Sequence, residues 1–288
     1  MGYDNHIVEA VRDTLVQAGS TFRDDQKRAY QRAIGLEVND TAKWTLETIL
    51  ENAEIAERNR SPLCDDTGIP HLLLEVGPNR AVTGEMLDAI DEGVRQGLRM
   101  LPGRPMAILG EGVERLDQHL GMDEDPGALE PAPIQIRKID EDVLRLHVLM
   151  FGGGPALRGK TLRIFHKHNT QNVTDELVAW ATENTGLLGC TPCVLAIGIG
   201  RSQYEATSMM LQAMVDGTFD VQSELEQEIT NRVNAVGVGA SSLGGNTTVL
   251  ATFVKIGPQR ASGYRVVCMR PCCCFEPRLA SVELSANP

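Results

Sequence analysis

Three short stretches of this 288-residue chain combine cysteine with turn-forming residues, and each could carry chemistry. The first is "PLCDDTG", in which Cys64 stands beside Asp65 and Asp66, after a proline and before Thr67-Gly68. A thiolate is a soft metal ligand, and a nearby carboxylic acid can exchange a proton with a group that the metal polarises. This stretch therefore predicts a metal-assisted acid–base site.

The other two stretches supply the remaining cysteines. "GLLGCTPC" holds a C-x-x-C formed by Cys190 and Cys193, and "VVCMRPCCC" holds Cys268 and the run from Cys272 to Cys274. Flanking glycine and proline let loops bring distant thiolates to one point, which suits an iron–sulfur cluster. Any one of these cysteines alone is more often a small buried apolar side chain. The cluster hypothesis therefore rests on all three stretches together.

A lone C-x-x-C also occurs in thiol redox proteins and as half of a zinc site. There is no second C-x-x-C in the sequence. The histidines are not spaced as zinc partners; they are His6, His71, His119, His147, His166 and His168. Disulfides are disfavoured because the number of cysteines, seven, is odd and we expect no export signal. A zinc-stabilised protein stays open as the weakest alternative.

Helices and strands alternate around these stretches. Residues 1–60 repeat apolar side chains at a three-to-four spacing, which predicts a helical N-terminal cap. Residues 61–288 contain short apolar runs typical of buried strands, separated by amphipathic helical segments and by a long loop over 103–133. We predict an α/β fold in which the cap is followed by a mixed sheet flanked by helices, all in one compact unit. The thiol of Cys64 then lies in a helix-to-strand loop.

Composition excludes several classes of protein. Lys and Arg number 27 against 39 Asp and Glu, a net charge of −12, and no basic run is long enough to follow a phosphate backbone. We therefore expect no nucleic-acid partner. Acidic residues occupy the N-terminus where a signal peptide would be apolar, and no stretch reaches the length of a membrane span. We expect a cytoplasmic protein without a membrane partner.

The motifs carry a resemblance to a known family. "PLCDDTG", "GGGP", "GCTP" with "GIG" soon after it, "SLGGNTT" and "VVCM" occur in the order seen in the alpha-type catalytic region of iron–sulfur hydro-lyases. This is the family of class I fumarase and L-tartrate dehydratase, and the resemblance spans roughly residues 40–270. It implies a [4Fe-4S] cluster held by three cysteines, with the fourth iron open to substrate. By position the matching ligands are Cys64, Cys190 and Cys268.

The resemblance also implies catalytic and substrate-binding residues. Asp66 matches a family aspartate close to the substrate hydroxyl, as an acid or a water-positioning group. Asp65 stands where the family usually has glutamine, which shifts the binding preference towards a hydroxyl or a cation. Arg104 matches an arginine that pairs with a substrate carboxylate, a task that suits its forked guanidinium. Gly153 and Gly154 match a glycine loop whose backbone N–H groups approach the substrate.

Two departures from the family pattern affect the third ligand and the pocket. Where the family has a histidine before a proline, this chain has Gly257 before Pro258. Family members show aromatic and arginine residues after the third cysteine, whereas Cys268 is followed by "MRPCCCFEPR". One cysteine of the run Cys272 to Cys274 is therefore an alternative third ligand. A spare thiolate on the fourth iron would instead make a redox or sensing site.

The resemblance implies a function and a partner. We expect the alpha subunit of a hydro-lyase that hydrates or dehydrates a small hydroxy dicarboxylate, fumarate/malate or tartrate-like. The base and further carboxylate-binding residues come from a beta-type subunit in this family, so we expect activity only with that partner. Homodimerisation of the alpha/beta unit is also expected. The alternative is a non-catalytic iron–sulfur binding, assembly or sensing protein on the same fold.

Overall fold

The computed structural model describes residues 4–101, 103–104 and 106–284. Their contacts divide the chain into two compact units that interleave along the sequence. The first unit comprises Met1–Phe22, Ala53–Gly152 and Arg278–Pro288. The second comprises Arg23–Asn52 and Gly153–Pro277. The expected boundary at residue 60 stays a prediction, and each unit is described by itself below.

Helices fill the N-terminal part of the chain, as the apolar spacing predicts: α1 (Asn5–Ser20), α2 (Asp24–Leu36) and α3 (Asp40–Asn59). Helix α1 begins after Asp4, whose carboxylate accepts the N–H of His6 at 3.1 Å. At the start of α3 the capping side chain is that of Asn39, which accepts two backbone N–H groups. Such caps satisfy N–H groups that have no partner inside the helix.

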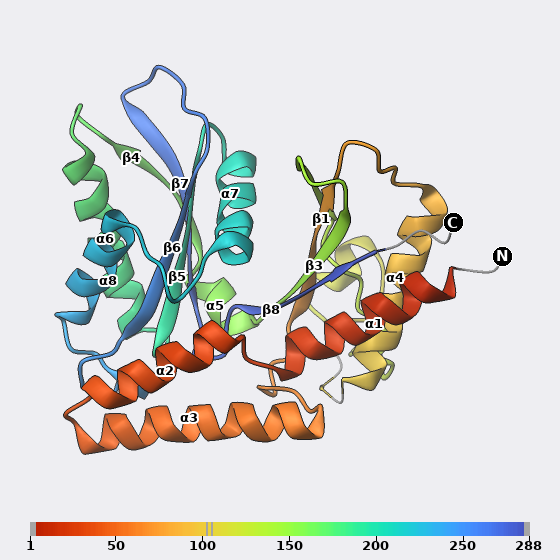
Figure 1. The fold of residues 1–288 in the computed structure, drawn as a ribbon, viewed down its shortest axis with the longest axis horizontal. Coiled ribbons are helices and arrows are strands. Elements are labelled where there is room, and N and C mark those ends of the chain that lie inside the picture. The colour runs from red at the N-terminus through yellow and green to blue at the C-terminus, as the bar shows by residue number, and fades with distance from the viewer. Residues whose placement is uncertain (1–3, 102, 105, 285–288) are drawn as a thin grey trace. The chain divides into compact units, whose positions relative to one another are not determined.

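The first unit is built on a four-stranded mixed sheet with the order β2-β1-β3-β8. Its strands are β1 (Ile69–Val76), β2 (Gln135–Lys138), β3 (Leu144–Phe151) and β8 (Arg278–Glu283). Strand β1 is parallel to β2 and antiparallel to β3, which is antiparallel to β8. Helices α1 and α4 (Gly84–Met100) pack against one face of this sheet (Figure 1).

The core of the first unit lies between these two helices and the sheet. Alternate strand residues such as Leu74 and Leu146 point into it, together with Val11 and Ile90 of the helices. Helix α4 approaches α1 closely at Gly93, where a Cβ atom would lie 2.7 Å from the Cβ of Val11. The glycine therefore allows a helix contact that any larger side chain would push apart.

The second unit contains another four-stranded mixed sheet, in the order β4-β7-β5-β6. Its strands are β4 (Lys160–Phe165), β5 (Cys193–Gly200), β6 (Val249–Ile256) and β7 (Tyr264–Cys272). Its helices after α2 are α5 (Gly153–Arg158), α6 (Thr170–Gly186), α7 (Gln203–Asp216) and α8 (Glu224–Asn234). Helices α6 and α8 share a core with one face of the sheet, and α7 lies on the other face (Figure 1).

The predicted α/β class with mixed strands and flanking helices is confirmed, with the strands divided between two sheets. In the described part of 103–133 the regular elements are two short 3₁₀ helices, η1 (Gly112–Arg115) and η2 (Pro126–Ala128). No helix in the described ranges is long and apolar enough to cross a membrane.

A buried polar network joins all four strands of the first sheet. Glu75 of β1 is 5% exposed, and its carboxylate accepts hydrogen bonds from Arg137 of β2 and Arg145 of β3. The Nε2 atom of His147 lies 3.3 Å from Glu75, and its Nδ1 shares a 2.7 Å hydrogen bond with Ser281 of β8. Residue alternation sets this network on the face opposite α1 and α4.

Burial controls the protonation of this network. It lowers the pKa of His147, and the Glu75 carboxylate offsets only part of that effect. Burial alone would raise the pKa of Glu75, but the hydrogen bond from Arg137 and the nearby imidazole of His147 outweigh it and lower that pKa. Both groups therefore resist protonation in the folded chain more than in the unfolded chain. Acid must weaken the fold through both of them.

We predict that His147→Gln reduces the loss of stability between pH 7.5 and 5.5. Below the unfolded histidine pKa of about 6.5, the unfolded chain takes up a proton that folded His147 does not, which costs up to about 1.4 kcal/mol per pH unit. Urea unfolding followed by circular dichroism at several pH values measures this slope. The matched control is His6→Gln, because His6 is exposed. Equal slopes for His147→Gln and the unmodified chain would contradict the prediction.

Candidate functional site

The loop between α3 and β1 carries the first set of predicted site residues. Cys64 and Asp66 are half-buried, Asp65 is exposed and Thr67 is buried. The N–H of Thr67 donates to the carbonyl of Asp65 at 3.0 Å, which closes a tight turn. The Sγ atom of Cys64 lies 3.5 Å from Oδ1 of Asp65. The loop thus holds one thiol and two carboxylates on adjacent residues of a defined turn.

A buried arginine fixes the backbone of this loop. Arg278, at the start of β8, is 2% exposed. Its Nη1 donates to the carbonyls of Asp66 (2.7 Å) and Thr67 (3.0 Å), and its Nε donates to the carbonyl of Met150 (3.2 Å). A buried guanidinium keeps its charge and must be hydrogen-bonded, so these carbonyls cannot move away from it. The sequence analysis missed this residue, although it noted an arginine in the family downstream of the third cysteine.

Two glycines let the loop lie tightly against the end of β3. Gly68 has φ +86°, and a Cβ there would lie 2.7 Å from the carbonyl oxygen of Phe151. A Cβ on Gly152 would lie 2.8 Å from Oδ2 of Asp66 and 3.3 Å from Nη2 of Arg278. The carboxylate of Asp66 therefore lies directly over Gly152, and a larger residue there would displace it.

Arg104 lies close to Asp65 in the first unit. Its Nη1 atom is 3.9 Å from Oδ2 of Asp65, and the two side chains are 57% and 86% exposed. An ion pair this long and this solvated is weak. The guanidinium of Arg104 is therefore accessible to another carboxylate, and the first unit brings Asp65, Asp66 and Arg104 to one loop region.

The remaining glycines of the "GGGP" motif belong to the second unit. Gly153 and Gly154 are exposed and form the first turn of the short helix α5. The sequence analysis predicted a glycine loop here, and the structure has the start of a helix. Their proposed approach to substrate stays a prediction.

In the second unit, Cys190 lies next to the run of three cysteines. It is exposed in the turn that precedes β5, and its carbonyl accepts the N–H of Cys274 at 2.9 Å. Cys193 and Cys272 are fully buried in the neighbouring strands β5 and β7. Burial raises the pKa of both thiols, which disfavours the thiolate form that binds metals. These two cysteines therefore have the properties of structural apolar side chains.

Cys268 lies farther along the sheet. It is in the middle of β7, paired with Thr161 on one side and Gly198 on the other. Cys272 is four positions further along the strand, about 13 Å away at about 3.3 Å per residue. Its strand neighbours Val267 and Met269 face α6 and α8. Alternation then directs Cys268 to the opposite face, the side of α7. The structure does not bring Cys268 next to Cys190.

Hydrogen bonds from α2 and a buried ion pair fix the turn that contains Cys274. The hydroxyl of Tyr30 donates to the carbonyl of Cys274 at 2.6 Å, and the amide of Gln26 donates to the carbonyl of Glu276 at 3.5 Å. Arg270 and Glu276 form an ion pair at 3.0 Å, and they are 5% and 0% exposed. Removing one partner of such a pair would leave an uncompensated buried charge. The turn after β7 is therefore held as firmly as the Cys64 loop.

The "SLGGNTT" motif lies against the turn that carries Cys190. The hydroxyl of Thr191 donates to the carbonyl of Gly239 at 2.6 Å and accepts the N–H of Ser242 at 3.2 Å. The N–H of Ser241 donates to the carbonyl of Thr191 at 2.9 Å. Gly239, Ser241 and Ser242 all have positive φ angles. This strained loop is thus tied to the residue that follows Cys190.

All seven cysteines are thiols in the structure. Cys64 belongs to the first unit and Cys190, Cys268 and Cys274 belong to the second. Over the residues that the structure describes, no three His, Cys, Asp or Glu side chains are gathered as a metal-binding group.

The sequence matches a known protein family. The family model described as fumarate hydratase (Fumerase) matches residues 8–283 of the 288. The chain therefore belongs to the fumarate hydratase family, which is a family of hydro-lyases. The family predicted from the motifs is confirmed, and so is the prediction that the chain is an enzyme of the hydro-lyase class.

Within the family, the sequence is similar to alpha subunits of L(+)-tartrate dehydratases. The chain is 27% identical to a provisionally named L(+)-tartrate dehydratase subunit alpha of Methanocaldococcus jannaschii, over 87% of this chain and 88% of the relative. It is 22% identical to the L(+)-tartrate dehydratase subunit alpha of Escherichia coli K12, over 93% and 88%. The corresponding protein of Shigella sonnei is equally similar.

We predict that the thiols react with iodoacetamide in the order of their burial. In the reduced, metal-free chain, Cys190 and Cys64 should be alkylated first. Cys193 and Cys272 should react on the order of 100-fold more slowly, because they need local opening of the sheet. Peptide mass spectrometry at timed intervals measures each rate, and labelling in urea provides the reference for full reactivity. Labelling of Cys272 at the rate of Cys190 would contradict the described packing.

Proposed function

We propose that this chain is the alpha subunit of an iron–sulfur hydro-lyase that reversibly adds water to, or removes it from, a small hydroxy dicarboxylate. The observation that carries the proposal is the Cys64 loop. It holds a soft ligand and a carboxylic acid two residues apart on a backbone that Arg278 fixes. Family membership supports the same class of reaction. Tartrate-like and malate-like substrates are the proposed class.

We propose Cys64, Cys190 and Cys274 as the cluster ligands, with Cys274 in place of Cys268. Cys274 lies in a turn bonded to the backbone of Cys190, whereas Cys268 lies within a strand on the α7 side of its sheet. Phe275 follows Cys274 directly, and Arg278 comes four residues later. This order agrees with the aromatic and arginine residues that the resemblance implies after the third ligand.

The donor set fits a [4Fe-4S] cluster. Each proposed ligand is a thiol in a loop or turn, where a side chain can turn towards a metal without breaking a strand ladder. Cys193 and Cys272, whose thiols burial keeps protonated, are left as structural residues. A bound cluster with one open iron would supply a Lewis acid at the substrate hydroxyl.

The chain's own polar residues have distinct roles in this proposal. Asp66 holds a proton, or orients a water, beside the hydroxyl that leaves or enters. Arg104 binds a substrate carboxylate through both arms of its guanidinium. Asp65 accepts a hydrogen bond from a substrate hydroxyl, which an acceptor-only carboxylate can do and which favours a hydroxyl-rich substrate such as tartrate. The backbone contacts of Arg278 fix the loop that carries Asp65 and Asp66.

We also propose a beta-type partner subunit. The relatives in Methanocaldococcus jannaschii and Escherichia coli are named as subunit alpha. The partner would supply the base and further carboxylate-binding groups, and the alpha/beta unit would form a homodimer. A cytoplasmic location suits an oxygen-sensitive cluster.

We predict that Cys64→Ser, Cys190→Ser and Cys274→Ser each abolish a stable cluster, whereas Cys268→Ser retains it. Each serine lacks the thiolate that the iron requires. Iron and acid-labile sulfide per chain, with the visible spectrum, are measured after purification without oxygen; the unmodified chain should approach about four of each. Cluster loss in Cys268→Ser together with retention in Cys274→Ser would restore Cys268 as the ligand.

We predict that Asp66→Asn lowers kcat for tartrate dehydration or fumarate hydration by about 10²- to 10⁴-fold while the iron content is unchanged. An amide has the shape of the carboxylic acid but cannot deliver its proton. The assay uses the chain purified with its beta-type subunit, and the exposed Asp140→Asn is the matched control. Full activity in Asp66→Asn would remove this residue from the reaction. A stable cluster without any hydration activity in the unmodified complex would favour the non-catalytic alternative.

A further inference from the structure

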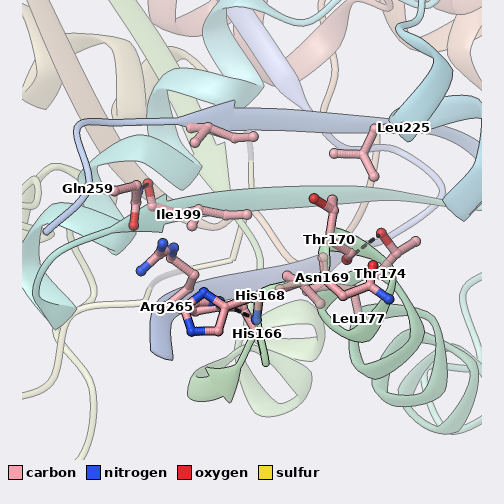
Figure 2. A pocket seen from close by; sticks show the side chains of 12 residues that line it. His166, His168, Asn169, Thr170, Thr174, Leu177, Ile199, Leu225, Gln259 and Arg265 are labelled. Carbon is pink, nitrogen blue, oxygen red and sulfur yellow. Dashed lines mark hydrogen bonds between the residues drawn. The ribbon is translucent and has the colours of Figure 1, made fainter. Parts of the chain in front are cut away.

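The second unit contains a cavity of about 220 Å³ far from its cysteine turns (Figure 2). The cavity lies at the carboxyl ends of the parallel strands β5 and β6, where Ile199 and Ile256 line it. Cys190 precedes the opposite end of β5. Ile199 is six positions after Cys193 along the strand, about 20 Å away at about 3.3 Å per residue. The cavity is therefore distinct from the proposed cluster site.

Five apolar side chains line the cavity: Val173 and Leu177 of α6, Leu225 of α8, and the two isoleucines of the strands. Asn169, Thr170 and Thr174 line it beside Leu177 (Figure 2). Leu177 is 1% exposed and Ile199 is 5% exposed, and both belong to the core that α6 and α8 share with the sheet. The cavity thus interrupts a hydrophobic core at its edge, and an apolar group would fill it favourably.

The arginine and the two histidines among the lining residues gather at one end of this cavity. Figure 2 shows Arg265, Gln259, His166 and His168 together on the side away from Leu225. The Nη1 atom of Arg265 donates to the carbonyls of Tyr264 (2.9 Å) and Ser262 (3.3 Å), which fixes the side chain. The described residues provide no acceptor for its Nε or Nη2 atoms. Arg265 therefore has donors left for an anion.

The two histidines support this arrangement in different ways. His166 accepts the N–H of His168 at Nδ1 (3.0 Å), so its Nε2 carries the proton that it donates to the carbonyl of Ser262 (2.7 Å). The imidazole of His168 lies 5.1 Å from that of His166, and its ring nitrogens have no partner within the described part of the chain. Hydrogen bonds therefore hold the imidazole of His166 in place in the cavity lining. His168 can donate a second hydrogen bond to an anion at the Arg265 end of the cavity.

The charge around the cavity differs from that of the whole chain. The net charge of the protein is −12, yet none of the twelve lining residues is Asp or Glu and one is Arg. The nearby acids Asp175 and Glu228 are engaged with Arg232 and Gln171. A guanidinium without an acidic neighbour in the lining favours a bound anion.

We propose that this cavity binds a small carboxylate with an apolar body of about the size of benzoate. A dry cavity of about 150 Å³ accommodates benzene, so 220 Å³ holds a six-membered ring with a carboxylate at the polar end. The carboxylate pairs with Nε and Nη2 of Arg265, and the ring packs between Leu177, Ile199 and Leu225. This site is independent of the proposed cluster and of the hydro-lyase reaction.

Isothermal titration calorimetry with sodium benzoate on the full-length chain tests the proposal at constant ionic strength. We expect saturable binding with a Kd on the order of 1 mM, as for a ligand of this size. Benzyl alcohol, which has the ring without the charge, and acetate, which has the charge without the ring, should each bind at least about tenfold more weakly. Equal binding of benzoate and acetate, or no saturable heat from benzoate, would overturn the proposal.

Variants locate the bound benzoate. Arg265→Gln should weaken benzoate binding at least about tenfold, and Leu225→Trp should abolish it by filling the cavity. The matched control is Arg163→Gln, because Arg163 is exposed on β4 and stacks on Phe165 rather than lining the cavity. Circular dichroism verifies that each variant is folded. Unchanged benzoate binding in folded Leu225→Trp would overturn the assignment to this cavity. If Arg163→Gln weakened benzoate binding as much as Arg265→Gln does, benzoate would be attracted only by positive charge, and the proposed pairing with Arg265 would be wrong.

Discussion

The candidate site of the first unit depends on one buried cation. The guanidinium of Arg278 cannot release its proton and has almost no access to water, so it must be satisfied by the oxygen atoms around it. Those oxygens include the backbone carbonyls of Asp66, Thr67 and Met150, which belong to the Cys64 loop and to β3. Because neutral carbonyls replace water here, loss of any of them would leave part of a charge unsolvated. The Cys64 loop, strand β3 and strand β8 are therefore one rigid block, and Cys64 and Asp66 are part of it.

In the second unit, different groups fix the backbone of the turn that contains Cys274. Its cysteine turn is held through the carbonyls of Cys274 and Glu276, which accept hydrogen bonds from Tyr30 and Gln26 of α2, and through the ion pair of Arg270 with Glu276. In both units most of these interactions end on backbone carbonyls, and the second unit adds one ion pair between side chains. Such anchoring gives the precision that a metal site needs, since a loop without it is the least precisely positioned part of a scaffold.

The sequence predicts those parts of this architecture that leave a local pattern. The three-to-four apolar spacing within residues 1–60 is local, and the helices that it predicts are confirmed. The apolar runs of β1 and β5 are local patterns of the same kind. Strand β2 has four residues with no apolar alternation, and β8 begins with a buried arginine, so neither was predicted. The division into two sheets depends on pairing between distant segments, such as β3 with β8, and periodicity carries no information about it. In the same way, spacing alone could not tell that Cys268 lies in a strand and Cys274 in a turn, because both follow apolar residues and stand near a proline.

The exchange of an amide for a carboxylate at Asp65 has consequences that follow from its position. Asp65 and Arg104 are both well exposed and 3.9 Å apart, so their mutual attraction is weak and a substrate carboxylate can displace it at small cost. The same carboxylate repels a dianion unless something on the substrate donates a hydrogen bond to it. A hydroxyl does so, and an unsaturated dicarboxylate without hydroxyls does not. Within the proposed substrate class, Asp65 would therefore discriminate through an unpaired charge as much as through a new contact, and the proposal favours the substrate with more hydroxyl groups.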